Sequence, residues 1–327
     1  METKILNITE GLKPAVELLK NGEVVAFPTE TVYGLGADCT NGRAVEKIFM
    51  AKGRPQDNPL IVHIADIGDA EKVAKNIPEE FYLLAEKFLP GPLTVILHKG
   101  DDVSEIVTAG RDTVGIRLPA NEAARTIIRE SGIFLAAPSA NASKHISPTT
   151  AKHVYDDLKG RIPLIIDGGV CSVGIESTIL DLTNEQPIIL RPGAVTREML
   201  AEVLGEVNVY KNTNVKVALA PGMKYKHYAP KVPAIMADDV QSVISEYKKA
   251  VKKNLRPVII GKNHPEYFLL NLLDIGSTGE EYARNVYEAL HCAEENYSYI
   301  IVERLEDEGV SHSVMNRLIK ATKQEEK

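Results

Sequence analysis

The sequence predicts an α/β protein with two domains joined by a linker. The chain has 327 residues, a length typical of two domains that each bury a core. Short apolar runs bounded by proline or glycine alternate with segments whose apolar residues recur at helical spacing. After residue 231 the two patterns alternate strictly, which is typical of a mostly parallel sheet covered by helices.

The first domain is expected to span residues 1–205. Its first strand, Val24 to Phe27, is apolar throughout and ends at Pro28, which cannot donate to a β-ladder. Residues alternate from Thr113 to Leu118, so Arg117 shares a sheet face with a glycine and leaves room for a ligand above it. The other strands are predicted at residues 60–64, 93–97, 133–137, 164–167, 178–182 and 187–190, and the helices at 11–20, 44–50, 69–75, 79–88, 122–131, 150–158 and 196–204.

Residues 206–231 have no amphipathic period but contain prolines, glycines, lysines and tyrosines. Because a plain linker favours small or charged residues over aromatic ones, this segment is expected to dock on another part of the protein. Residues 232–327 form the expected second, smaller α/β domain. Its strands are predicted at 233–237, 257–261 and 299–303, and its helices at 240–251, 279–295 and 310–322.

Composition argues against several classes of protein: broad nucleic-acid binders, zinc or disulfide-rich proteins, and secreted or membrane proteins. The formal net charge of −7 argues against broad, non-specific nucleic-acid binding, although it leaves a local basic patch open. Three cysteines lie far apart without a Cys-x-x-Cys pair, which favours a reducing compartment over a zinc site or a disulfide framework. The N-terminus lacks the apolar run of a signal peptide, and no stretch approaches the ~18 apolar residues of a membrane span. The expected location is the cytoplasm, away from membranes.

Polar residues cluster where the first strands end. Thr29 and Thr31 follow the first strand, and loops at strand ends commonly carry binding groups. Gly34 and Gly36 are expected to allow a tight or positive-φ backbone close to a ligand. His63 is placed on a sheet by the apolar run around it.

Four cations are candidates for holding an anion. Lys52, Arg54, Arg117 and Arg191 each lie next to a proline, a glycine or a strand end. If they converge, they would suit a triphosphate or its transition state; the alternative is that they are solvated surface charges. The chain has neither Gly-x-x-x-x-Gly-Lys-[Ser/Thr] nor Gly-x-Gly-x-x-Gly, so a nucleotide would have to be held in another way.

Each remaining candidate also has a structural interpretation. His63 could be a satisfied core histidine, and Thr29 and Thr31 could cap backbone groups at a strand end. The loop from Pro138 to Thr149 is rich in short donors and bracketed by prolines, so its serines and asparagine could bind an anion or only satisfy the loop itself. Tyr228 could pack in the core of the second domain. The residues alone predict an α/β protein with an anion-binding pocket.

The same residues also form an ordered set of motifs. FPTETVYGLG, KGRPQDNPLIVHI, PGPLT, TVGIRLP, APSANASKHISPT, GIESTI and LRPGAVT resemble, in this order, the YrdC family. With APGMKYKHYAPK and a second α/β domain, the chain resembles the long, two-domain form of that family, the L-threonylcarbamoyladenylate synthases. The match is dense over about residues 10–230, and the C-terminal third matches in its arrangement and its ending, SVMNRLIKAT.

This resemblance implies a fold and a reaction. The fold would be a YrdC-like twisted, open α/β sheet in residues 1–205, a docking linker in 206–231 and a Rossmann-like α/β domain in 232–327. The reaction would convert L-threonine, bicarbonate or CO2, and ATP with Mg²⁺ into L-threonylcarbamoyl-AMP, diphosphate and water. The product would pass to the tRNA threonylcarbamoyl transferase machinery that modifies adenosine 37 of tRNA. A rival interpretation is a double-stranded-RNA-binding protein that uses the concave basic face without chemistry.

The resemblance also implies residue roles. Catalytic roles fall to Lys52, Arg54 and Arg117, and no residue is expected to bind the metal directly, because Mg²⁺ would travel with ATP. The threonine site would comprise Thr29 or Thr31, His63, Arg117, Ala137 and Ser177. The ATP site would comprise Lys52, Arg54, Asn58, Thr113, Ser139, Asn141, Ser147 and Arg191, with Tyr228 of the linker closing over it.

Overall fold

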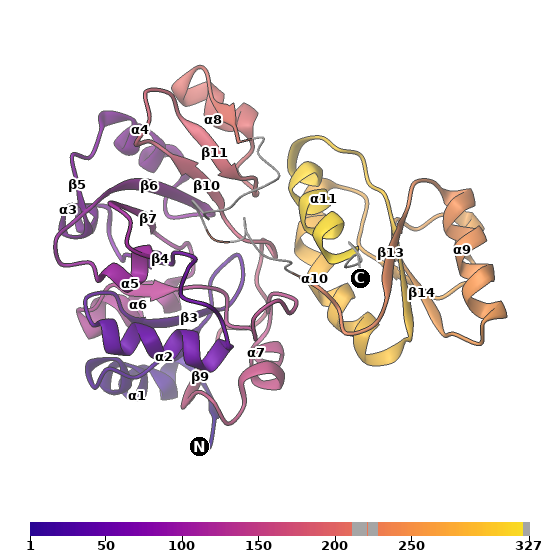
Figure 1. The fold of residues 1–327 in the computed structure, drawn as a ribbon, viewed down its shortest axis with the longest axis horizontal. Coiled ribbons are helices and arrows are strands. Elements are labelled where there is room, and N and C mark those ends of the chain that lie inside the picture. Colours follow the sequence, from indigo (N-terminus) through magenta and orange to yellow (C-terminus); the bar gives the residue numbers. More distant parts are fainter. Residues whose placement is uncertain (211–220, 222–227, 323–327) are drawn as a thin grey trace. The chain divides into compact units, whose positions relative to one another are not determined.

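A computed structural model describes residues 1–210, 221 and 228–322 of the chain. The chain divides into two compact units (Figure 1). The N-terminal unit comprises residues 1–143 and 148–225, and the C-terminal unit comprises residues 144–147 and 226–327. Most of the predicted linker, at 211–220 and 222–227, lies outside the described residues, so the predicted boundaries at 205 and 231 stay predictions.

The N-terminal unit is built on a mixed sheet of 12 strands. Its order is β1-β9-β2-β3-β8-β4-β7-β6-β10-β11-β12, and β5 pairs with β6 at the side of this path. The strands are β1 (Lys4–Asn7), β2 (Val25–Phe27), β3 (Gly34–Asp38), β4 (Ile61–His63), β5 (Ala74–Lys75), β6 (Leu93–Lys99), β7 (Thr113–Arg117), β8 (Leu135–Ala137), β9 (Leu164–Asp167), β10 (Thr178–Asp181), β11 (Ile188–Arg191) and β12 (Asn208–Val209). The helices are α1 (Ile8–Lys20), α2 (Gly42–Lys52), α3 (Ala70–Val73), α4 (Glu79–Phe88), α5 (Glu105–Thr108), α6 (Glu122–Ser131), α7 (Ala151–Leu158) and α8 (Arg197–Leu204), with a 3₁₀ turn at Ile67–Asp69.

Alternate residues of the central strands belong to two separate cores. In β2, Ala26 packs with the apolar face of α2, whereas Val25 and Phe27 pack with α1 and α6. Since side chains along a strand point to opposite faces of the sheet, helices cover both faces here. The prediction for β7 is confirmed, because Val114, Ile116 and Leu118 all belong to the core that α2 closes. Arg117 therefore lies on the other face.

The prediction for Gly34 and Gly36 is wrong in its backbone geometry. Neither residue is among the positive-φ glycines; both lie in β3, paired with β2. A Cβ on Gly34 would lie 2.8 Å from Phe27 Cζ, and one on Gly36 would lie 2.8 Å from Phe27 Cε1. The two glycines are thus needed for the Phe27 ring to pack across the strand.

Gly36→Ala is expected to lower the free energy of unfolding by about 1–3 kcal/mol, because its Cβ would collide with the Phe27 ring and lie 3.2 Å from Leu135. Urea unfolding of the full chain measures this. Gly68→Ala is the matched control, since no atom lies within 4 Å of its added Cβ. Equal midpoints for the two variants would contradict the packing role of Gly36.

Other differences from the predicted elements come from long-range pairing. The predicted helix at residues 69–75 is shorter than expected: α3 ends at Val73, and β5 pairs with the far end of β6. Among the described residues, six strands and helices have no counterpart in the prediction: β1, β3, β5, α5, β12 and β15. Strand β3, with the sequence GLGAD, is glycine-rich and has low strand propensity, so its position between β2 and β8 stabilises it.

The C-terminal unit has a parallel four-stranded sheet in the order β13-β16-β14-β15. The strands are β13 (Ala234–Ala237), β14 (Pro257–Gly261), β15 (Leu272–Asp274) and β16 (Tyr299–Glu303), and the helices are α9 (Val240–Lys252), α10 (Gly279–Asn296) and α11 (Gly309–Thr322), with a 3₁₀ turn at Pro265–Tyr267. Helix α9 covers one face of the sheet, and α10 and α11 cover the other (Figure 1). The predicted Rossmann-like arrangement is confirmed. In the described parts of both units, no helix combines the length and apolar character needed to cross a bilayer.

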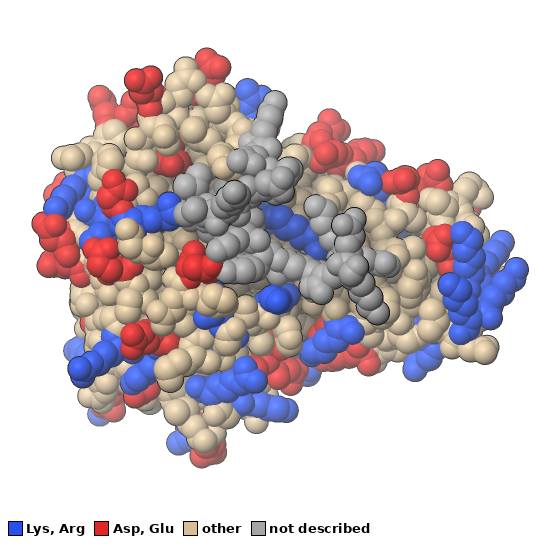
Figure 2. Space-filling view, viewed as in Figure 1, with Lys and Arg blue, Asp and Glu red and all other residues tan. Residues whose placement is uncertain are grey.

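The local basic patch left open by the net charge is found on α9. Figure 2 shows basic side chains gathered over this helix, and Lys248, Lys249, Lys252 and Lys253 are exposed there. Cations near a helix C-terminus interact favourably with the helix dipole. Lys249 and Lys252 lie in the last turn of α9, where this effect applies.

Candidate functional site

Lys52 holds the loop that follows β8. It is the last residue of α2, which ends at Gly53 in the left-handed conformation. Its side chain is buried, and Nζ donates to the carbonyl oxygens of Ser139 and Asn141, each at 2.5 Å. Burial and then the positive charge of Arg54 hold the pKa of the Lys52 ammonium well below its ordinary value. Four residues of the predicted ATP site therefore lie in one region of the N-terminal unit: Lys52, Arg54, Ser139 and Asn141.

The polar side chains of this loop bind within the loop itself. Ser139 Oγ donates to Asn141 Oδ1 at 2.5 Å, and Asn141 Nδ2 donates to the carbonyl of Ala142 at 3.0 Å. The amide of Ala142 donates to Asp157 Oδ2 at 2.9 Å. These contacts fix the loop in one conformation, which agrees with the structural interpretation of its serine and asparagine.

Arg54 and Asn58 lie on the segment between α2 and β4. Arg54 Nη2 donates to the carbonyls of Asn58 and Pro59, at 3.0 and 3.3 Å. Asn58 is fully buried, and neither its side-chain nitrogen nor its oxygen has a hydrogen-bond partner among the described residues. A buried amide left without partners costs about 1–3 kcal/mol, so a polar ligand would be favoured beside it.

A buried charged pair lies on the face of the sheet opposite α2. His63 on β4 is in register with Arg117 on β7. Glu30, in the loop after β2, places Oε1 2.8 Å from Arg117 Nη2, and both side chains are buried. Glu30 Oε2 accepts a hydrogen bond from the amide of Ala120 at 3.1 Å. The sequence argument missed Glu30; the signal was its place between two candidate threonines at a strand end.

His63 is neutral at physiological pH. Its ring packs edge-on against Phe27, with the ring centroids 5.7 Å apart. Burial and then the nearby charge of Arg117 lower the pKa of His63 to about 3. A neutral imidazole beside a guanidinium can accept or donate one hydrogen bond without adding charge.

The low pKa of His63 predicts a loss of stability in acid. The unfolded histidine gains a proton below a pKa of about 6.5, whereas the folded one stays neutral down to about 3, so unfolding takes up a proton. At pH 5 this group therefore lowers the free energy of unfolding by about 2 kcal/mol relative to pH 7.5. Urea unfolding of the wild type and His63→Gln at both pH values measures the difference. The same pH dependence in both proteins would contradict the prediction.

Thr29 forms a hydroxyl-capped turn. Its Oγ1 accepts from the amides of Thr31 and Val32, at 3.1 and 3.2 Å, and donates to the Val32 carbonyl at 2.6 Å. The hydroxyl of Thr31 lies 2.9 Å from that of Thr29. The strand-end capping interpretation of Thr29 thus has direct support, and the choice between the two threonines as a substrate contact stays open.

Arg191 and Ser177 are also brought together. Arg191 Nε and Nη2 donate to the Ser177 carbonyl, at 3.1 and 2.9 Å, and Nη1 donates to the carbonyl of Pro221 at 3.3 Å. The Ser177 hydroxyl lies 3.2 Å from Arg191 Nη2 and 2.8 Å from the hydroxyl of Thr94, which the sequence did not single out. Ala137 ends β8, where it pairs with β4.

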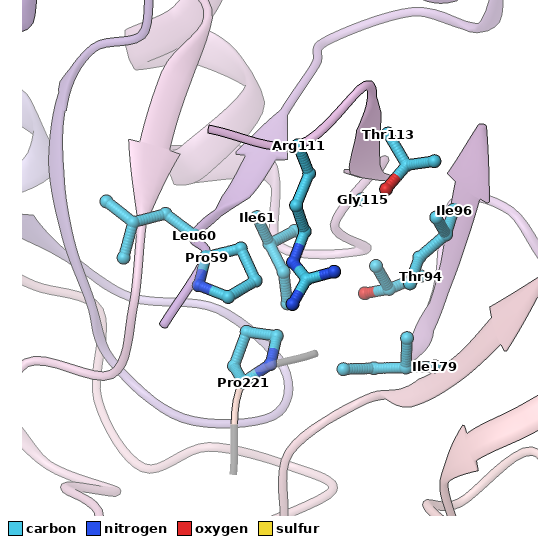
Figure 3. A pocket seen from close by; sticks show the side chains of 10 residues that line it. All are labelled: Pro59, Leu60, Ile61, Thr94, Ile96, Arg111, Thr113, Gly115, Ile179 and Pro221. Atoms are coloured by element: carbon cyan, nitrogen blue, oxygen red, sulfur yellow. The ribbon is translucent and has the colours of Figure 1, made fainter. Parts of the chain in front are cut away.

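A small cavity of about 10 Å³ lies beside these groups (Figure 3). Its lining includes Thr94, Thr113, Gly115, Pro59 and Pro221. The side chain of Arg111 reaches between the two prolines and Thr94. Of the predicted ATP-binding residues, Thr113 is therefore close to a guanidinium that the sequence argument missed. Arg111 lies two residues before β7, in a loop with no recognisable motif.

Two residues of the predicted ATP site, Ser147 and Tyr228, belong to the C-terminal unit. The carbonyl of Ser147 lies 3.2 Å from His291 Nε2. Tyr228 is buried and has a positive φ of 65°, and its ring stacks on that of Tyr287 with the centroids 5.5 Å apart. The core-packing interpretation of Tyr228 therefore has direct support, and its role over ATP stays a prediction.

Comparison with known proteins gives matches over both units. A family model described as "Telomere recombination", which covers Sua5, YciO and YrdC proteins, matches residues 17–193. A second, described as "Threonylcarbamoyl-AMP synthase, C-terminal domain", matches residues 195–322.

Individual relatives match along nearly the whole chain. A threonylcarbamoyl-AMP synthase of Pyrococcus abyssi is 43% identical, with 98% of each chain covered. One of Bacillus subtilis is 45% identical, covering 94% of this chain and 91% of the relative. The crystal structure of P. abyssi Sua5 complexed with L-threonine has a TM-score of 0.92 at 42% identity, covering 98% of this chain and 97% of that one. The chain belongs to the threonylcarbamoyl-AMP synthase family.

Proposed function

We propose that this chain is an L-threonylcarbamoyladenylate synthase. It would convert L-threonine, bicarbonate and ATP into L-threonylcarbamoyl-AMP, diphosphate and water, or L-threonine, CO2 and ATP into the same adenylate and diphosphate without water. This is the first step of the N6-threonylcarbamoyl modification of tRNA adenosine 37. The observation that carries the proposal is the similarity, over nearly the whole chain, to proteins named for this activity and to the structure of P. abyssi Sua5 complexed with L-threonine.

The reaction requires positioning and charge stabilisation more than a covalent nucleophile. The threonine amine adds to CO2 as a neutral group, and an oxygen of the resulting carbamate attacks the α-phosphorus and displaces diphosphate. A guanidinium suits the threonine carboxylate, which is the role of Arg117. Lys52, Arg54 and Arg191 would balance the charge of the phosphates and of the transition state.

The observed contacts refine this assignment. Lys52 and Arg191 donate to backbone carbonyls of the loops that carry Ser139 and Ser177, so they support those loops in addition to any contact with a phosphate. As the resemblance implies, Mg²⁺ would be carried by the phosphates of ATP. The tRNA threonylcarbamoyl transferase machinery as a partner, direct binding of tRNA or double-stranded RNA, and a cytoplasmic location stay predictions.

One incubation tests the proposal. Purified protein receives ATP, Mg²⁺, bicarbonate and labelled L-threonine, and the readouts are diphosphate release and a threonine-derived adenylate separated by chromatography. Product is expected only with all three substrates, and it is expected to be lost when L-serine replaces L-threonine. Intact ATP, together with retention of duplex RNA by the protein, would replace the proposal with the RNA-binding interpretation.

A further inference from the structure

We propose that Glu30 is a positioning residue that fixes the guanidinium of Arg117 for a ligand carboxylate. The inference rests on the proposed function, because it deepens the assignment of Arg117 to the threonine carboxylate. Glu30 would act through Arg117 and not on the reacting atoms. It would set the threonine requirement without setting the ATP requirement.

The two oxygens of Glu30 hold different parts of the segment around Arg117. Oε1 lies 2.8 Å from Arg117 Nη2, at the end of β7, and Oε2 accepts from the amide of Ala120, three residues further along. The backbone carbonyl of Glu30 accepts from the amide of Val173 at 2.7 Å, on the segment that leads to Ser177. One residue thus ties the end of β7 to a second segment that carries a predicted threonine contact.

Some nitrogen donors of the Arg117 guanidinium have no hydrogen-bond acceptor among the described residues. The side chains of Arg117 and Glu30 are 5% and 7% exposed, so water can replace few missing partners. Arg117 Nε, Arg117 Nη2 and Glu30 Oε1 all lack a well-aligned hydrogen-bond partner among the described residues, so the 2.8 Å contact is an ion pair and not an aligned hydrogen bond. A guanidinium that served only the fold would have its buried donors satisfied, because each unpaired donor costs free energy. The two unsatisfied donors, Nε and Nη2, mark the place of an acceptor, and a carboxylate that binds two donors in parallel is the group that fits.

A carboxylate with the same local pattern occurs in the C-terminal unit. Glu303 at the end of β16 lies with Oε1 2.8 Å from His264 Nε2, and its Oε2 accepts from the amide of Lys262 at 3.0 Å. Its side chain is 7% exposed, as that of Glu30 is. Glu303 therefore provides a control with equal burial and a similar backbone contact, but with a histidine in place of the arginine and in a different unit.

The experiment compares Glu30→Gln, Glu30→Asp, Glu303→Gln and the wild type as full chains. Calorimetry gives the dissociation constants of L-threonine and, separately, of a non-hydrolysable ATP analogue with Mg²⁺. We expect Glu30→Gln to weaken threonine binding by about tenfold or more and to leave the analogue within about twofold, because the neutral amide can accept one hydrogen bond but loses the ionic attraction to the guanidinium. Glu30→Asp keeps the charge and should restore part of the affinity, whereas Glu303→Gln should leave both constants unchanged.

A second readout separates failure of this inference from failure of the proposed function. The Nε–H resonance of Arg117, assigned with Arg117→Lys, reports the order of the guanidinium without any ligand. Glu30→Gln is expected to shift and broaden it, and Glu303→Gln is expected to leave it unchanged. An unaltered resonance, or equal losses for threonine and the ATP analogue, would overturn the positioning role. A wild type that binds no threonine would overturn the proposed function, and the resonance would still decide whether Glu30 orders Arg117.

Discussion

Arg117→Ala is expected to raise the KM for L-threonine by about 100-fold and to leave the KM for ATP within about twofold. A charge-assisted, bidentate contact with a carboxylate is worth roughly 2–3 kcal/mol, which corresponds to this factor. The effect should be specific for threonine, because Arg117 pairs with Glu30 and is in register with His63, whereas Lys52 contacts the loop after β8. Initial rates of diphosphate release, with one substrate varied at saturation of the others, measure both constants.

The variant also leaves Glu30 buried without its cation, which alone can cost about 3–5 kcal/mol of stability. Arg117→Ala combined with Glu30→Gln removes both charges and should recover most of that stability. The double variant should not recover threonine affinity. If the double variant unfolds near the wild-type urea concentration and its two KM values rise equally, Arg117 is not the threonine contact.

Local patterns could predict the elements whose signals lie within one segment. Helix α4 has the predicted bounds because its apolar residues follow helical spacing and the Pro-Gly-Pro segment stops the chain after Leu89. Strands β9, β14 and β16 also have their predicted bounds. Strand β3 could not be predicted from its own sequence. Its glycines are required because a Cβ at either position would collide with the ring of Phe27 on the neighbouring strand.

In the candidate site, too, the sequence indicated single residues but not the contacts between distant segments. The sequence identified the four cations as candidates because each lies next to a proline, a glycine or a strand end, but it left open whether they are buried. The partners of those cations come from distant segments: Glu30 is 87 residues from Arg117, and Ser139 is 87 residues from Lys52. Only the folded sheet brings such pairs together. Motif reading found Lys52 and Arg117 but missed Glu30, Thr94 and Arg111 for this reason.

Lys52→Met is expected to lower kcat/KM by about 100- to 1,000-fold, the usual cost of one lost donor at a site of developing negative charge. Methionine keeps most of the volume of the side chain but cannot donate to the carbonyls of Ser139 and Asn141. Both carbonyls then lose a buried partner, at about 1–3 kcal/mol each, and relief of the buried charge offsets part of this loss. The loop should become mobile, so ATP binding should weaken as well.

A pH series separates the charge of Lys52 from its hydrogen bonds. Because burial depresses its folded pKa below the ordinary value of 10.5, the unfolded wild type binds more protons, and its stability gains from this group as pH rises toward 10.5. In Lys52→Met, this increase of stability with rising pH should be absent. Lys47→Met is the matched control, since Lys47 is on the same helix but pairs with Glu23 at the surface. If Lys52→Met and Lys47→Met show the same activity and the same slope of stability with pH, the ammonium of Lys52 has neither role, and the loop after β8 is held by its own side chains.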